Sequence, residues 1–212
     1  KRVIISNNSI RITSGSGNRY GIWLTGTDYC DVAVIGNSIY SDTVGRIGIY
    51  CDEGGQNIRI ENNILHGCWI DTLHLRYSSI NNNTIILLGS TDDLRGIALR
   101  GSRDCEVMGN KLRRDGDTTE DRTQCGILIY WASPAWPGQQ NTVWHNVVDG
   151  WNYSITDDCW GDVTSHNDIS YNRVSGIISR KAGVGWKGRI MENTLISNPS
   201  KSAAIELSLI HI

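Results

Sequence analysis

The residues of this chain whose chemistry stands out recur at similar places in successive stretches of sequence, and the predicted catalytic residues are Asp52, His74, Arg76 and Arg100. An arginine can bind a carboxylate through two parallel hydrogen bonds, and a carboxylate held in this way makes the neighbouring carbon more acidic. His74 or Tyr50 could then remove a proton from that carbon as a general base. Asp52 could orient His74 or, together with Glu53, bind a cation such as calcium. These groups predict elimination or epimerisation on an acidic sugar.

Aromatic side chains near these groups could hold sugar rings, because their flat faces are apolar. Two insertions, 113–124 and 131–138, interrupt the fifth repeat, and long loops on a rigid scaffold often carry function. The second insertion contains Trp131 and Trp136 and is stiffened by two prolines; alternatively, one of these two side chains covers a small cluster within its own loop. The predicted substrate-binding residues are Trp23, Tyr50, Tyr130, Trp131 and Trp136.

The polar residues also fit a simpler interpretation, in which they form a ladder of charges on an exposed surface. Cross-strand pairs of that kind contribute only about 0.2–1 kcal/mol each. Carboxylates offer a rival chemistry, because glycoside hydrolases need two carboxyl groups roughly 5–9.5 Å apart. Asp157 and Asp158 follow one predicted strand and Asp71 precedes another, but a solvated turn explains the Asp157-Asp158 pair better. No cofactor is expected, and no metal is assigned, since neither cysteines nor histidines show ligand spacing.

A short motif that recurs eight times must position these residues: an aliphatic residue, two residues of any kind, Asn, one further residue and a second aliphatic residue. Its asparagines are Asn8, Asn37, Asn63, Asn83, Asn110, Asn146, Asn172 and Asn193. A repeat of 20 to 36 residues cannot bury its own apolar face, so the copies must stack and share one core. Asn tolerates the left-handed backbone conformation, which predicts a turn at each asparagine. Stacked at one level, the side-chain amides would hydrogen-bond to one another as a ladder.

Each repeat divides into three short strands, because its apolar residues alternate with a period of two. The third strand carries the signature Gly-Ile-x-aliphatic, as in 21–24, and a weaker copy is Thr72-Leu73-His74-Leu75. With Ile and the aliphatic residue inward, the residues between and after them form two outward columns. The first predicted column is Trp23, Tyr50, His74, Ala98, Leu128, Ser154 and Ile178, and the second is Thr25, Asp52, Arg76, Arg100, Tyr130, Thr156 and Arg180.

The combination of Asn-x-[Ile/Leu/Val] with Gly-Ile-x-Leu resembles the right-handed parallel β-helix of the pectate lyase and polygalacturonase type. The resemblance covers nearly the whole chain and implies an all-β solenoid of about eight coils, with three short parallel sheets. It also implies a substrate groove over the Gly-Ile-x-Leu sheet and an extracellular or cell-surface location. The Gly-His-Gly and Arg-Ile-Lys motifs of polygalacturonases are absent, so no hydrolase residue is carried over.

Composition argues against several classes of partner. The 212 residues carry a net charge of −2, so no basic surface indicates nucleic acid and no polybasic segment indicates a membrane surface. The longest aliphatic run, 85–88, is far shorter than a membrane span. Cys51 and Cys105 occupy aliphatic positions, which favours small core residues over a disulfide framework for the six cysteines.

We expect residues 1–206 to form a single β-helix domain, a fragment truncated at both ends, because the chain opens in the middle of a repeat. Residues 207–212 resemble the translation of a sequencing adapter and are set aside as an artefact. A natural last strand is the alternative, since Ile205 and Leu207 fit the repeat.

Three functions remain open. The first is an enzyme acting on an acidic polysaccharide, with lyase or epimerase chemistry favoured over hydrolysis because basic groups outnumber paired carboxylates. The second is a glycan-binding module without catalysis, such as part of a phage tailspike or an adhesin. The third is a structural solenoid whose site lies outside these residues. A β-helix supports many functions, so the fold alone does not choose among them.

Overall fold

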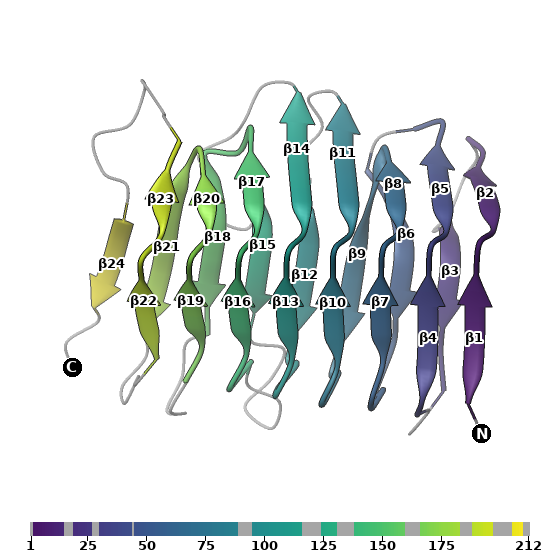
Figure 1. Cartoon of the computed structure of the whole chain (residues 1–212), viewed down its shortest axis with the longest axis horizontal. Coiled ribbons are helices and arrows are strands. Elements are labelled where there is room, and N and C mark those ends of the chain that lie inside the picture. Colours follow the sequence, from purple (N-terminus) through teal and green to yellow (C-terminus); the bar gives the residue numbers. More distant parts are fainter. Residues whose placement is uncertain are drawn as a thin grey trace.

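The computed structural model describes residues 2–14, 19–26, 30–43, 45–88, 95–115, 124–130, 138–159, 166–182, 188–196 and 205–209. Within these residues every regular element is a β-strand, and the 24 strands form eight coils of three parallel strands each. The coils stack along one axis, from β1 near the N-terminus to β24 near the C-terminus (Figure 1). The predicted all-β parallel helix of eight coils is confirmed.

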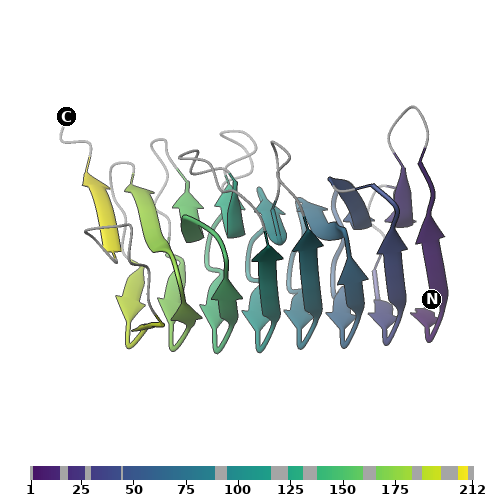
Figure 2. The same ribbon diagram turned by 90° about the horizontal axis from the view of Figure 1, so that it is seen from above.

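Three eight-stranded sheets run along the stack, and Figure 2 shows their strands side by side from above. Sheet A contains β1 (Val3–Ser6), β4 (Val32–Ile35), β7 (Arg59–Glu61), β10 (Ser79–Asn81), β13 (Glu106–Met108), β16 (Thr142–Trp144), β19 (Asp168–Ser170) and β22 (Arg189–Met191). Sheet B contains β2 (Ser9–Ile12), β5 (Ser38–Ser41), β8 (Ile64–His66), β11 (Thr84–Leu88), β14 (Lys111–Asp115), β17 (Val147–Asp149), β20 (Arg173–Val174) and β23 (Thr194–Leu195). Sheet C contains β3 (Tyr20–Leu24), β6 (Arg46–Cys51), β9 (Cys68–Leu73), β12 (Ile97–Arg100), β15 (Cys125–Tyr130), β18 (Tyr153–Asp158), β21 (Ile177–Ala182) and β24 (Ile205–Leu209).

The core consists of aliphatic side chains stacked in columns, one above another in successive coils. In sheet C one column is made entirely of isoleucine: Ile22, Ile49, Ile70, Ile97, Ile127, Ile155 and Ile178. Each of these side chains is at most 6% exposed. Burying one such side chain contributes about 1.5–3 kcal/mol, so the columns supply most of the stability of the stack. Cys51 and Cys105 are also buried in this core, as predicted.

The eight motif asparagines form the predicted ladder between sheets A and B. Asn63, for example, donates from Nδ2 to Asn83 Oδ1 at 2.9 Å and to the carbonyl oxygen of Val34 at 2.9 Å. Asn83 Oδ1 also accepts from the backbone N–H of Asn63, so one amide links three successive coils. The same pattern extends from Asn8 to Asn193. A second, shorter ladder lies between sheets C and A, where Asn141 donates to Asn167 at 3.1 Å.

The ladder asparagines do not adopt the left-handed backbone conformation, so that part of the prediction was wrong. The residue before each of them does: Asn7, Gly36, Asn62, Asn82, Gly109, His145, Tyr171 and Glu192 all have φ between 52° and 66°. The preceding residue turns the chain, and this leaves the ladder amide pointing into the stack, where the asparagine side chains of the six inner coils are buried. One residue therefore makes the turn, and the asparagine after it forms the hydrogen bonds of the ladder.

Space, rather than backbone conformation, requires the glycine of the Gly-Ile-x-aliphatic signature. At Gly126 a Cβ atom would lie 2.2 Å from Val148 Cγ1 and 2.8 Å from the carbonyl oxygen of Ser154. At Gly96 a Cβ atom would lie 2.3 Å from Leu112 Cδ2. In both cases the obstructing side chain belongs to sheet B of the next coil. Because the glycine and the following isoleucine both face the core, the residue before the glycine turns outward.

One predicted boundary differs from the structure. The first insertion was expected to begin at residue 113, but β14 continues to Asp115 and buries Arg114, which is 3% exposed. The remainder of that insertion, 116–123, lies outside the described residues, as does 131–137 with Trp131 and Trp136. At the other end, β24 pairs with β21 and runs from Ile205 to Leu209, and the interpretation of 207–212 as an artefact stays a prediction.

Candidate functional site

A cleft of about 520 Å³ lies on the outer face of sheet C, over the strands of the first four coils. Its charged lining residues are Arg19, Arg46, Asp71, Arg95 and Arg100. Four arginines and a single carboxylate give this part of the surface a net positive charge. A cleft of that composition attracts anionic ligands, and the attraction weakens as salt screens it.

An aromatic platform, made of Tyr20, Trp23 and Tyr50, borders the cleft. The Tyr20 ring stacks on Tyr50 with centroids 5.0 Å apart and lies 5.1 Å from the Trp23 ring. Gly21 explains this arrangement, because Gly21 and the next residue both face the core and Tyr20 therefore turns outward. Trp23 is 53% exposed, so the platform offers a flat apolar surface to a ligand. The predicted pairing of Trp23 with Tyr50 is confirmed.

A fixed ion pair connects the platform with the cationic part of the cleft. Arg100 donates from Nε and Nη2 to the two carboxylate oxygens of Asp71, at 2.8 and 2.9 Å, and its Cζ lies 5.8 Å from the centroid of the Tyr50 ring. Burial raises the pKa of Asp71 above its ordinary value, although the charge of Arg100 opposes the rise. The two-point contact holds the guanidinium in one orientation, so its position is set before any ligand binds.

The register of the third coil differs from the prediction and changes which residue lies beside Tyr50. Asp71, not His74, pairs with Tyr50 on one side and Ala98 on the other. The expected strand Thr72-Leu73-His74-Leu75 was wrong because β9 starts early, at Cys68, only one residue after β8. Thr72 therefore faces the core, where its hydroxyl donates to the carbonyl oxygen of Ala98 at 2.9 Å.

Arg76 and Arg100 do not lie next to each other, so the predicted two-arginine clamp is not formed. Arg100 pairs with Leu73 in sheet C, whereas Arg76 lies at the corner before sheet A and bridges to Gln56 and Arg103. The second outward column was therefore wrong at its third position.

His74 lies at the start of that corner with a φ of 58° and does not line the cleft. Burial lowers the pKa of His74 below its ordinary value; the carboxylates of Glu53 and Asp52 oppose this shift, and Arg100 and Arg76 add to it. The imidazole is therefore neutral at pH 7. The structure does bring the four predicted catalytic residues close enough for their charges to act on His74, but His74 is not part of the aromatic platform or of the cleft lining. Asp52 keeps a contact there, since its Oδ1 accepts from the Tyr50 hydroxyl at 3.3 Å.

Beyond the fourth coil the residues at the first outward position of sheet C are buried; Leu128 is apolar, whereas Thr156 and Ser179 are polar. Tyr130 packs against a second hydrophobic cluster, separate from the core, that contains Ala98, Cys125, Leu128, Tyr153 and Ile177. Tyr130 pairs with Arg100 and with Asp158, so its backbone follows the cleft along the sheet. Trp131 and Trp136 were predicted to bind sugar next to it and lie outside the described residues.

The last predicted outward positions were wrong as well. In coil six Ile155 pairs with the inward Ile127, so Thr156 takes the outward position predicted for Ser154. Asp157 then faces the core and forms an ion pair of 2.5 Å with Arg180, and both side chains are 2% exposed. Asp157 is therefore part of β18 rather than of a solvated turn, and Arg180 does not face solvent. Ser179, not Ile178, continues the first outward column.

Several cleft residues were missed in the sequence, namely Arg19, Tyr20, Arg46, Trp69 and Arg95, and Asp71 was considered only as a carboxylate of the rival hydrolase chemistry. Two of them carried a readable signal, because Tyr20 and Arg95 each directly precede the glycine of the Gly-Ile-x-aliphatic signature. Because the glycine faces the core, the residue before it turns outward and lies on the outer face of sheet C, where the cleft is. Trp69 and Asp71 could not be found in this way, since the third coil lacks that glycine.

The described residues contain no group of three or more His, Cys, Asp or Glu side chains that could hold a metal ion. None of the structural elements described is a helix long and apolar enough to cross a membrane. All six cysteines are free thiols, and Cys30 is the exposed one.

One comparison with known proteins gives a match. A family model described as a right-handed β-helix region matches residues 1–169. Neither the curated proteins nor the solved structures contain a match to the chain.

Proposed function

The chain belongs to the right-handed β-helix family, and we propose that it uses this scaffold to bind an acidic polysaccharide in the cleft on the outer face of sheet C. The observation that carries the proposal is the combination in one cleft of four arginines with a single carboxylate, beside an exposed aromatic platform. A sugar ring needs an apolar face to stack on, and a uronate needs a fixed positive charge nearby.

The spacing of the cleft suits a polymer. Successive strands of a sheet are about 4.8 Å apart, close to the length of one sugar ring, so a chain along the axis meets a new coil at each residue. Tyr20, Trp23 and Tyr50 offer the stacking surface over the first two coils. Arg100, held in place by Asp71, supplies a preorganised positive charge next to that surface. Preorganised groups lose little side-chain entropy when the ligand binds.

Binding is better supported than bond cleavage. Asp71 is the one carboxylate among the residues that line the cleft, whereas glycoside hydrolysis needs two. Elimination needs a base, but burial raises the pKa of Tyr50 above its ordinary value, which keeps its hydroxyl protonated at neutral pH. His74 would be neutral and able to accept a proton, yet it does not line the cleft. A glycan-binding module therefore fits this arrangement better than a lyase, an epimerase or a hydrolase.

Affinity electrophoresis tests the proposal. We expect gels containing polygalacturonate or alginate to retard the protein, and added salt to weaken the retardation. Trp23→Ala should reduce the affinity about tenfold, because it removes the exposed indole ring of the platform. A matched control is Tyr40→Ala, since Tyr40 is 51% exposed but belongs to sheet B, outside the cleft. The proposal fails if no uronate polymer retards the protein, or if the two variants behave alike.

The same mixtures separate binding from catalysis. A rise in ultraviolet absorbance from unsaturated uronate would indicate a lyase, and new reducing ends without that rise would indicate a hydrolase. We expect neither product, and either one would overturn the assignment of a binding module.

A further inference from the structure

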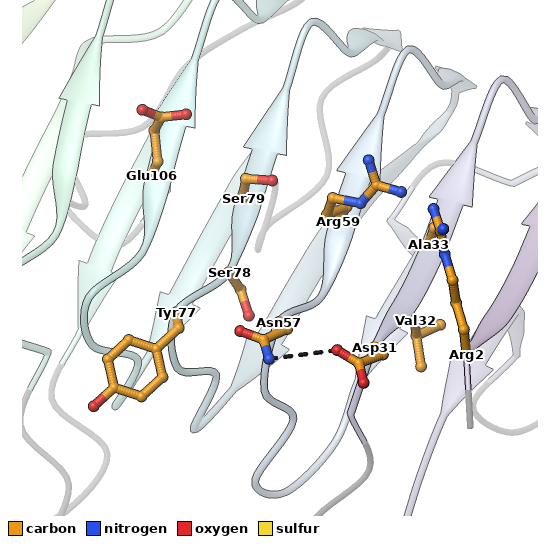
Figure 3. Close-up of a pocket in the computed structure, with 10 residues that line it drawn as sticks. All are labelled: Arg2, Asp31, Val32, Ala33, Asn57, Arg59, Tyr77, Ser78, Ser79 and Glu106. Carbon is orange, nitrogen blue, oxygen red and sulfur yellow. Dashed lines mark hydrogen bonds between the residues drawn. The ribbon is translucent and has the colours of Figure 1, made fainter.

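A second cleft, of about 630 Å³, lies on the outer face of sheet A and at the corner that leads into it. It shares no lining residue with the cleft on sheet C. Two rows of side chains border it (Figure 3). The sheet row is made of Ala33, Arg59, Ser79 and Glu106, which pair in register across β4, β7, β10 and β13. The corner row is made of Asp31, Asn57 and Tyr77.

The corner row has the spacing of the coils. Its members each follow one residue of a continuous line of backbone bridges, Cys30 to Gln56 to Arg76. They are therefore about 4.8 Å apart along the axis. Figure 3 shows Tyr77, Asn57 and Asp31 in that order, with Asn57 Nδ2 donating to Asp31 Oδ1 at 3.4 Å. A ring stacked on Tyr77 would thus have an amide next to it and a carboxylate one coil further.

Tyr77 is an unusual residue for its position, because the backbone there has a positive φ. The equivalent corner residues of neighbouring coils, Asp31, Asn57, Asp104 and Gln140, all have φ between 53° and 58°, and Tyr77 has 49°. Short polar residues such as Asp and Asn tolerate this left-handed conformation, whereas a bulky tyrosine adopts it at a cost. Strained residues of this kind concentrate at functional sites, and the strain persists only where something else offsets it.

A second tyrosine in the same conformation shows what a structural role looks like. Tyr171, with a φ of 56°, stacks on His145 at 5.3 Å between ring centroids. Tyr77 is 56% exposed, and within the described part of the chain its side chain makes no hydrogen bond or ring contact. Packing within the described coils therefore does not explain Tyr77, whereas it does explain Tyr171.

The charges of this cleft select a different class of ligand from the first cleft. Arg2 and Arg59 are balanced by Asp31 and Glu106, so the lining is close to neutral. Arg59 also lies 3.7 Å from Glu61, which reduces its field further. Such a lining offers donors and acceptors for hydroxyl groups without favouring an anion.

From these observations we infer that the cleft on sheet A binds a neutral saccharide, with one ring stacked on Tyr77 and hydroxyl groups bound by Asn57 and Asp31. The site is independent of the acidic-polysaccharide cleft. The molecule thus presents two glycan-binding faces of different charge preference around one stack of coils.

The test is affinity electrophoresis in gels that contain dextran, galactomannan, xyloglucan or mixed-linkage β-glucan. We expect at least one of these neutral polymers to retard the protein. Tyr77→Asn, which places the residue of the neighbouring coil in the same backbone conformation, should weaken the retardation about tenfold while the denaturation midpoint does not fall. Tyr171→Asn, the matched change at the other corner, should leave the retardation unchanged.

Three results would overturn the inference: no neutral polymer retards the protein, Tyr77→Asn is retarded as strongly as the unchanged protein, or Tyr171→Asn weakens retardation equally. Retardation through Tyr77 by uronate polymers alone would contradict the neutral class of ligand.

Discussion

At the scale of single residues, two adjacent side chains make each turn between sheets A and B, and they have opposite requirements. In the fourth coil Asn82 has a φ of 56° and is exposed, whereas Asn83 is buried and bonded to the coils on both sides. The sequence shows three asparagines in succession, 81–83, but only the third belongs to the ladder. The two positions therefore differ sharply in what a substitution should cost.

Asn83→Ala should lower the free energy of unfolding by about 3 kcal/mol or more. The change removes the hydrogen bonds of the amide to Asn63, Asn110 and the Ile60 carbonyl, and leaves their buried partners unsatisfied. Asn82→Gly should change it by no more than about 0.5 kcal/mol, because glycine adopts the same backbone conformation. Urea denaturation measures both values. Equal effects of the two substitutions would contradict the division of roles.

His74 should make stability depend on pH. Burial puts its pKa below the ordinary value of 6.5, so between the two values the unfolded chain holds the proton and the folded chain does not. Stability should therefore fall as the pH falls below about 6.5, and His74→Asn should flatten that part of the profile. Asparagine is chosen because it tolerates the φ of 58° at this position. Urea midpoints measured over this pH range check the prediction, and an unchanged slope in the variant would refute it.

At the scale of elements, the strands of sheet C show that a glycine directly before the isoleucine decides which side chains reach the outer face of the sheet. Where the complete signature is present, the glycine and the isoleucine both face inward and the preceding residue, such as Tyr20 or Arg95, faces outward. Side chains of sheet B leave no room for a Cβ atom at the position before the isoleucine, so only glycine fits there. The signature is therefore a packing constraint with a consequence for binding.

Gly126→Ala should destabilise the protein by about 1–3 kcal/mol, because the added methyl group meets Val148 and the carbonyl of Ser154. Val148→Ala should itself be destabilising, since it opens a cavity in sheet B. In the double variant the new methyl group partly fills that cavity, so its loss of stability should be smaller than the sum of the two single losses. A strictly additive double-variant cycle, measured by urea denaturation, would show that the two positions are not in contact.

Sequence reasoning predicted coils with complete signatures correctly and lost the register in the others. Trp23 and Tyr50 are paired as expected, because each follows an intact Gly-Ile. In coil three the aliphatic pattern pointed to Leu73 and Leu75. Leu75 is buried in the core, but Thr72 rather than Leu73 is the inward residue of β9, and its hydroxyl is satisfied there. In coil six the core accepts Asp157 because Arg180 lies beside it. A pattern of apolar residues cannot reveal a buried polar residue whose partner comes from another coil.

At the scale of the whole molecule, the stack of coils could be predicted in full outline, since eight copies of one motif leave few other ways to bury their apolar faces. The residues that line the two clefts could be predicted only in part. Their positions depend on strand register, which differs by one to three residues between coils without disturbing the stack. The same stack presents a cationic aromatic cleft on sheet C and a charge-balanced cleft on sheet A.

The most direct test is a crystal structure of the protein with a galacturonate trisaccharide. The account predicts one sugar ring stacked on Trp23 or Tyr50, its carboxylate within hydrogen-bond distance of an arginine of the cleft, and Asp71 paired with Tyr50 in the sheet. A sugar bound elsewhere, or a strand register that places His74 beside Tyr50, would contradict it.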